Sequence, residues 1–204
     1  KIWDSIMKIA LYMSSMRGGG AERVMLTLAN GLADEGVNID LVLNQAEGPY
    51  MKDISSKINI IDLNTSRALA SILPLTKYLK KEKPDAVLSA MNHINMIAIF
   101  SKLISLENPR VVLSEHNNLS TSLKPRGILY RTIYKKLMGW AYSRADKVVA
   151  VSDGVAIDLL KNLKKLDKSK VVTIYNPVIT PKLLKQKNDI FDEIKPYKDI
   201  DYII

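Results

Sequence analysis

Short apolar runs rich in β-branched residues alternate along the chain with longer segments that have helical periodicity. The apolar runs predict seven strands, over 8–13, 38–44, 58–63, 86–91, 110–114, 147–152 and 170–175. Helices are expected after the glycines at 18–20 and over 66–83, 94–106, 128–143 and 153–163. Because strands alternate with helices from end to end, we expect a Rossmann-like, doubly wound α/β fold with a mainly parallel sheet.

The apolar spacing also predicts which helical surfaces are buried. In the helix after the glycines, five apolar residues share one face, and Gly36 is expected to end the helix. The five are Ala21, Val24, Met25, Leu28 and Leu32. The segment 94–106 is apolar almost all round, so we expect that whole helix to be buried.

The pattern changes after Pro177. We assign residues 1–178 to one domain and residues 179–204, which carry two prolines and many charges, to a linker or tail. The last four residues read like the opening of another strand, which suggests a fragment of a longer, two-domain protein. Residues 1–6 do not form a signal peptide, and Met7 is an alternative natural start.

Composition excludes several kinds of chemistry. The chain has no cysteine and two histidines, which excludes disulfides and cysteine zinc sites and argues against a histidine-rich metal site. No run reaches the roughly 18–20 apolar residues of a membrane-spanning helix. The net charge of +9 favours anionic partners.

The most informative stretch is the glycine-rich turn Gly18–Gly19–Gly20 between the first strand and the first helix. Glycines allow close approach of a ligand, and the free N–H groups of the helix attract phosphates. The alternative is that the glycines only form a tight turn. A dinucleotide fingerprint fails because Arg23 stands at its third glycine, and no Gly-Lys-Ser/Thr follows for a Walker loop.

Polar residues follow five of the predicted strands. They are the glycines at 18–20, Asn92-His93, Glu115-His116-Asn117, Ser152-Asp153-Gly154 and Asn176. Because ligands of open parallel sheets bind beyond the carboxyl ends of the strands, these residues predict a cleft at that edge.

Four motifs in this order carry a family resemblance. They are GGGAERV at 18–24, SEHN at 114–117, VVAVSDGV at 148–155 and IYNPV at 174–178. With them the chain resembles the N-terminal domain of a GT-B glycosyltransferase of the retaining family-four group. The resemblance implies an acceptor-side half whose C-terminal, donor-binding domain is missing, and a fragment that is inactive alone.

The resemblance also implies roles for single residues. His116 would contact the transferred sugar as the catalytic residue, while Glu115 is not assigned a catalytic role. Substrate-binding residues would be Gly18, Gly19, Gly20, Asn117, Ser152 and Asn176. Alternatively, His116 binds a backbone carbonyl, Ser152 caps the next helix, and Asn176 shapes a turn. His93 is expected to be structural.

The same resemblance implies a nucleotide-sugar donor, a glycan or polyprenyl-linked acceptor and retention of configuration, with no metal and no other cofactor. The activity would serve cell-surface polysaccharide or glycan biosynthesis. The segment 124–147 is basic and interleaved with apolar and aromatic residues. Its candidate membrane or anion patch comprises Lys124, Arg126, Arg131, Lys135 and Lys136. We expect either peripheral contact with the cytoplasmic face of an anionic membrane, or an apolar face packed on the sheet with the charges in water.

Two other functions fit part of the pattern. A sugar-nucleotide epimerase can share the two-domain architecture but should carry a dense set of acids and histidines in this half. A basic nucleic-acid-binding module is supported only by the net charge, since no recognised motif or stacking platform is present.

Overall fold

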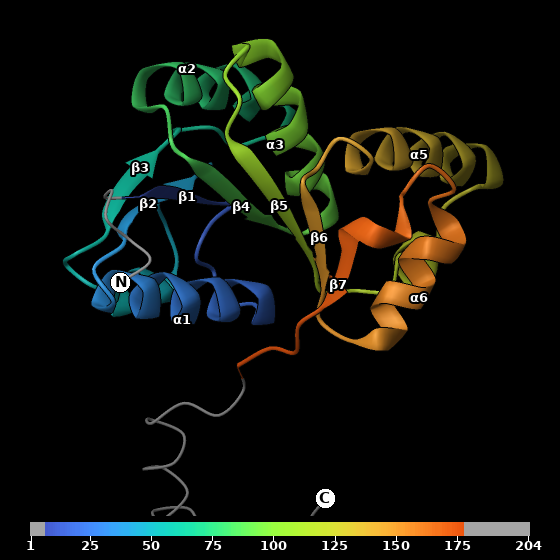
Figure 1. The fold of residues 1–204 in the computed structure, drawn as a ribbon, viewed down its shortest axis with the longest axis horizontal. Coiled ribbons are helices and arrows are strands. Elements are labelled where there is room, and N and C mark those ends of the chain that lie inside the picture. The colour runs from blue at the N-terminus through green and yellow to red at the C-terminus, as the bar shows by residue number, and fades with distance from the viewer. Residues whose placement is uncertain (1–6, 178–204) are drawn as a thin grey trace, which may run out of the picture.

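The computed structural model describes residues 7–177 as a seven-stranded, all-parallel sheet in the order β3-β2-β1-β4-β5-β6-β7 (Figure 1). The strands are β1 Lys8–Met13, β2 Asn38–Leu43, β3 Asn59–Asp62, β4 Ala86–Ala90, β5 Arg110–Glu115, β6 Lys147–Ala150 and β7 Val171–Thr173. All seven predicted strands are confirmed, with ends that move by one or two residues. The residues assigned to the linker, 179–204, and residues 1–6 lie outside the described range.

The helices are α1 Gly20–Asp34, α2 Ile72–Glu82, α3 Asn92–Ser105, α4 Leu119–Leu123, α5 Ile128–Tyr142 and α6 Asp153–Asn162, with 3-10 turns at Pro49–Asp53, Ala68–Ser71 and Lys168–Lys170. The helix predicted over 66–83 is confirmed over Ile72–Glu82, but its first part is a separate 3-10 turn, Ala68–Ser71. Ser71 is fully buried, and its hydroxyl lies 2.8 Å from Tyr12 Oη, which fixes a tight turn before α2. The short α4 was not predicted.

The helices cover the two faces of the sheet unequally (Figure 1). Side chains of α2, α3, α5 and α6 form one core with Ala10 and Tyr12 of β1, while α1 forms a second core with Leu11 and Met13. Right-handed crossovers explain this division. Only the connections that run from β1 toward β3 pass over the α1 face, whereas those from β3 through to β7 pass over the other.

The predicted buried face of α1 is partly wrong. Met25, Ala29 and Ala33 face the sheet, because small alanines let the helix lie close to the strands. Leu28, predicted to be buried, is 36% exposed at the side of α1 that faces the uncovered strands. The helix ends as expected, since Gly36 has φ 86° just beyond the C-cap.

The prediction that the whole of α3 is buried is also only partly right. The run from Ile94 to Ile99 lies in the core, but Leu103 and Ile104 near the end of α3 are 41% and 48% exposed. Only the outer side of the last turn of α3 is therefore exposed, since Ser105 on its inner side is 2% exposed.

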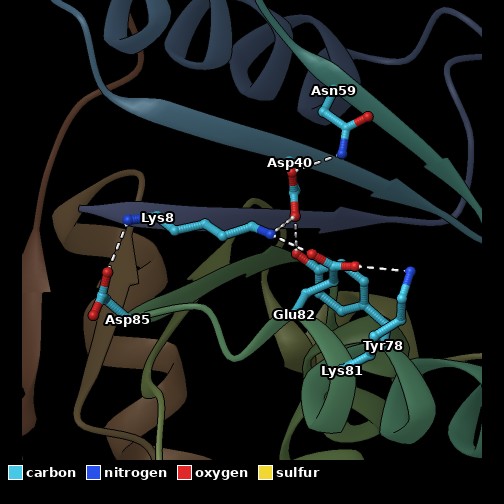
Figure 2. Close-up of polar contacts among 7 residues, drawn as sticks. All are labelled: Lys8, Asp40, Asn59, Tyr78, Lys81, Glu82 and Asp85. Atoms are coloured by element: carbon cyan, nitrogen blue, oxygen red, sulfur yellow. Dashed lines mark hydrogen bonds and ion pairs between the residues drawn. The ribbon is translucent and has the colours of Figure 1, made fainter. Parts of the chain in front are cut away.

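A polar cluster ties the amino-terminal end of the sheet together (Figure 2). Asp40 of β2 is 1% exposed and accepts hydrogen bonds from Tyr78 Oη at 2.6 Å and Asn59 Nδ2 at 3.0 Å. Lys8 Nζ lies 3.1 Å from the same carboxylate and 2.6 Å from Glu82. One buried carboxylate thus joins β1, β2, β3 and α2 at the edge opposite the predicted cleft.

Candidate active site

The predicted cleft residues gather at the carboxyl edge of the sheet. β4 pairs with β1 on one side and with β5 on the other. Since neighbouring strands lie about 4.8 Å apart, the ends of β1 and β5 are about 10 Å apart. The glycine-rich turn after β1 and His116 after β5 therefore belong to one site.

The glycine-rich turn leads directly into the start of α1. Gly18 has φ 109°, a conformation that favours glycine, and Gly19 is the N-cap of α1 with extended backbone angles. A Cβ built on Gly20 would meet no atom within 4 Å. The first N–H groups of a helix lack intrahelical partners, so this end of α1 can receive an anion.

A second loop, after β2, holds the turn in place. Met16 N donates to Glu47 O at 2.9 Å, and Tyr50 N donates to Met16 O at 3.2 Å. Gly48 lies so close that a Cβ there would stand 2.1 Å from the carbonyl oxygen of Met16, and its φ is 116°. The Gly48-Pro49 loop was visible in the sequence, but only the fold brings it against the glycine turn.

Sequence reasoning missed Glu22. A Cβ built on Gly19 would lie 2.1 Å from Glu22 Oε2, so this carboxylate sits over the glycine turn at the N-terminus of α1. Glu22 is the third residue after the N-cap, a position where glutamate typically folds back on the helix start. That spacing was a signal that the sequence offered.

His116 is half-buried beside the turn. Its Nε2 lies 3.1 Å from Ser114 Oγ. Burial lowers the pKa of His116 from its ordinary value, and the negative charge of Glu22 opposes this by favouring the imidazolium. The electrostatic effect of Glu22 on His116 connects the glycine turn with the predicted catalytic residue. Burial alone lowers the pKa of His93.

Glu115, the residue before His116, points into the protein. Its carboxylate accepts hydrogen bonds from Tyr142 Oη and from Asn95 Nδ2, the latter at 2.9 Å. Asn95 Nδ2 also lies 3.0 Å from Ser114 O. Burial raises the pKa of Glu115 to about 7, against the hydrogen bonds from Tyr142 and Asn95. Glu115 therefore stabilises the end of β5 from beneath the site.

Between the glycine turn and His116, the end of β4 holds an unusual backbone. Met91 has φ 79° although it is not glycine, and its N–H donates to Ser114 O at 3.3 Å. Such strained residues cluster at functional sites. Nothing in the residue types at 91–93 predicts this conformation.

The remaining predicted residues take different places. Asn176 lines an apolar cavity of about 260 Å³ together with Val24, Leu28 and Ser114, beside α1. Asn117 is exposed next to His116 at an open hollow that Val155 of α6 also lines. Ser152 accepts a hydrogen bond from Val155 N at 3.3 Å, so it caps α6, as the alternative reading held.

The predicted patch lies on and before α5. Lys124, Arg126 and Lys136 are exposed, while Arg131 and Lys135 are half-buried. Lys135 Nζ donates to Asn162 Oδ1 at 2.6 Å. Within residues 7–177, no three His, Asp or Glu side chains gather where they could hold a metal ion, and metal independence stays a prediction. No helix in this range is long and apolar enough to cross a membrane.

An all-parallel sheet that places a glycine-rich helix start near a histidine at its carboxyl edge defines a Rossmann-like ligand-binding domain. The sequence model of Glycosyltransferase Family 4 matches residues 18–181. The chain belongs to this family.

Two known proteins illustrate the similarity. The Campylobacter jejuni GalNAc-α-(1→4)-GalNAc-α-(1→3)-diNAcBac-PP-undecaprenol α-1,4-N-acetyl-D-galactosaminyltransferase is 27% identical over 170 residues, which cover 79% of this chain and 45% of that protein. The structure of Anabaena HepE in complex with UDP-glucose has a TM-score of 0.66 and 16% identity, covering 90% of this chain and 50% of HepE. The chain spans about half the length of the curated relatives it matches.

The fold by itself does not separate transferases from epimerases. The Rickettsia bellii UDP-N-acetylglucosamine 2-epimerase matches with a TM-score of 0.58 and 13% identity, over 97% of this chain and 50% of that protein. The family match, rather than the fold, makes the chain a glycosyltransferase sequence.

Proposed function

We propose that this chain is the acceptor-side half of a retaining glycosyltransferase that moves a sugar from a nucleotide-sugar donor to a glycan or lipid-linked acceptor. The observation that carries the proposal is the shared location of the α1 N-terminus and His116, joined by the charge of Glu22. The whole protein would include a donor-binding domain that faces this edge of the sheet.

Each part of the edge has a role in this reaction. The N–H groups at the start of α1 would hold the donor's phosphates or the transferred sugar and stabilise charge on the leaving group. His116, neutral near pH 7 because burial lowers its pKa, would donate a hydrogen bond to the transferred sugar. The cavity that Asn176 lines would accommodate part of a substrate.

A lipid-linked acceptor is supported by the Campylobacter relative, whose name specifies an undecaprenol-linked glycan. Such an acceptor would place the protein at the cytoplasmic face of a membrane, in the synthesis of a cell-surface glycan. The UDP-glucose bound to HepE supports a nucleotide-sugar as the donor.

The test uses the full-length protein and measures the release of nucleoside diphosphate from a panel of nucleotide sugars in the presence of lipid-linked glycans. His116→Ala should lower kcat by about 100-fold or more, because removing a donor that stabilises developing charge has this effect. His93→Ala is the matched control, since it removes the chain's other histidine. The coupling constant of the new anomeric proton should show retention.

Three outcomes would overturn the proposal. If His116→Ala keeps kcat within about threefold of the parent, the assigned role is wrong. Interconversion of nucleotide sugars without transfer would establish the epimerase alternative. Salt-sensitive binding of random oligonucleotides without sugar transfer would establish the nucleic-acid alternative.

A further inference from the structure

Helix α5 has two apolar faces. Met138, Ala141 and Tyr142 are fully buried against the core. On the outer side, Leu129, Ile133 and Leu137 follow one another at four-residue intervals and are 75%, 57% and 43% exposed. Residues four apart lie above one another on a helix, so these three form a continuous stripe. Ile128, 81% exposed, extends it at the start of the helix.

The stripe is unpartnered within the described chain. α5 packs on α3, and Lys135 on another side of α5 contacts Asn162 of α6, while the stripe itself stays exposed. A soluble surface helix normally turns its apolar residues to the core and its charges to water. The alternative that the apolar side chains of this segment pack on the sheet is therefore only partly right. α5 buries one apolar face against the core and leaves a second one exposed.

The charges around the stripe are of one sign. Residues 116–145 contain no acidic residue, and they carry six basic residues. These are Lys124, Arg126, Arg131, Lys135, Lys136 and Arg144. None of the six lies within 4 Å of a carboxylate of residues 7–177. Arg126 stacks over Tyr130 at 5.5 Å, which holds a positive charge beside the first turn of the stripe.

This combination identifies the partner's chemistry. A nucleic acid is bound through basic groups and aromatic stacking, and it offers nothing to three exposed aliphatic side chains. An anionic bilayer offers both phosphates for the basic side chains and acyl chains for the aliphatic ones. We propose that the outer face of α5 docks on an anionic membrane, with Leu129, Ile133 and Leu137 inserted below the headgroups.

The docked position also serves the site, and this step rests on the proposed function. Tyr142, the last residue of α5, donates a hydrogen bond to Glu115 at the end of β5, so α5 lies beside the edge that carries His116. A membrane against the outer face of α5 would bring the headgroup region close to that edge. A sugar on a lipid-linked acceptor would then reach the site without leaving the bilayer.

Vesicle co-sedimentation of this chain tests the docking without measuring activity. Two kinds of vesicle are compared. One is phosphatidylcholine alone, and the other also contains about 30 mol% of the anionic lipid phosphatidylglycerol. The chain should bind the anionic vesicles and lose binding at high salt. Leu129→Ser with Ile133→Ser, and separately Arg126→Gln with Arg131→Gln, should each weaken binding at least about tenfold.

Matched controls separate the face from general properties of the chain. Ile157→Ser removes an equally exposed aliphatic residue on α6, beside Asp153 and Asp158. Lys52→Gln with Lys168→Gln removes two exposed charges far from α5 in the sequence. Both controls should bind vesicles within about twofold of the parent, because neither touches the stripe or its flanking charges.

Several outcomes would overturn the docking and leave the proposed function standing. One is that the full-length protein transfers sugar while the parent and all variants bind the vesicles equally well. The same holds if the full-length protein transfers sugar and neither parent nor variants bind the vesicles. Another is a dimer in solution that Leu129→Ser with Ile133→Ser dissociates, since the stripe would then contact a second copy. Binding to oligonucleotides in preference to anionic vesicles would also overturn it.

Discussion

The carboxylate of Glu22 lies over the α-carbon of Gly19, at the point where α1 begins. It therefore occupies the approach to the free N–H groups of the helix, where a ligand phosphate would also be stabilised. The same charge acts on His116 across the end of β4. Glu22 thus links the two parts of the candidate site that the sequence had kept separate.

Glu22→Gln should lower the pKa of His116 further, because the substitution removes the negative charge that favours the imidazolium and leaves the effect of burial. The chain has two histidines, so an NMR titration gives one imidazole curve for each. His93 is the internal control, since burial alone shifts its pKa and its curve should not move. An unchanged His116 curve would show that the two groups do not interact.

The parent protein should lose stability at high pH because Glu115 becomes ionised in a buried place, and Glu115→Gln should remove this loss. Burial raises the pKa of Glu115 to about 7, so between its ordinary value and pH 7 the folded state binds more protons than the unfolded state. Stability from this group is therefore complete at low pH and is lost as pH rises through about 7. The difference in Tm between variant and parent should be more positive at pH 8.5 than at pH 5, conditions that bracket about pH 7.

The two histidines are present in both parent and variant, so their effect on the pH dependence of Tm cancels in the difference. Glu35→Gln, at the exposed residue that ends α1, is the control and should give the same Tm difference at both pH values. A Glu115→Gln difference that does not depend on pH would show that the carboxyl is ionised throughout.

Gly48→Ala should destabilise the protein by about 2 kcal/mol or more, because the added Cβ would meet the carbonyl of Met16 and the backbone has positive φ. Chemical denaturation measures the effect. Gly31→Ala in the last turn of α1 is the matched control, since its Cβ would stand in open space. The control should gain about 0.5–1 kcal/mol from helix propensity. Equal effects at both positions would contradict the close packing of the two loops.

Asp40→Asn should cost about 2–4 kcal/mol of stability, because the carboxylate accepts from Tyr78, Asn59 and Lys8, and an amide would turn its NH₂ toward one of these donors. Asp34→Asn breaks an exposed pair with Lys57 and should change stability by no more than about 0.5 kcal/mol. Denaturation of both variants tests the cluster in Figure 2. If Asp40→Asn lowers stability no more than Asp34→Asn does, the buried carboxylate does not hold the cluster together.

The strand positions were predictable because both faces of a parallel sheet are buried, which makes runs such as β1 and β2 continuously apolar. The edge location of His116 and the glycine turn followed, since carboxyl ends of parallel strands meet at one edge. The face of α1 was not predictable to the same accuracy. Met25 and Leu28 are equally apolar, and only the uneven covering of the sheet decides which of them is buried.

By itself, then, the sequence determined the α/β class, the parallel sheet and the strand ends that carry the site, because local periodicity and turn residues encode these features. Tertiary structure alone decided that Gly48 supports the glycine turn, that Glu22 acts on His116 and that Glu115 faces inward. It also decided that Leu129 and Ile133 of α5 face outward. Each of these depends on which segments distant in the chain lie side by side, and residue spacing carries no record of that.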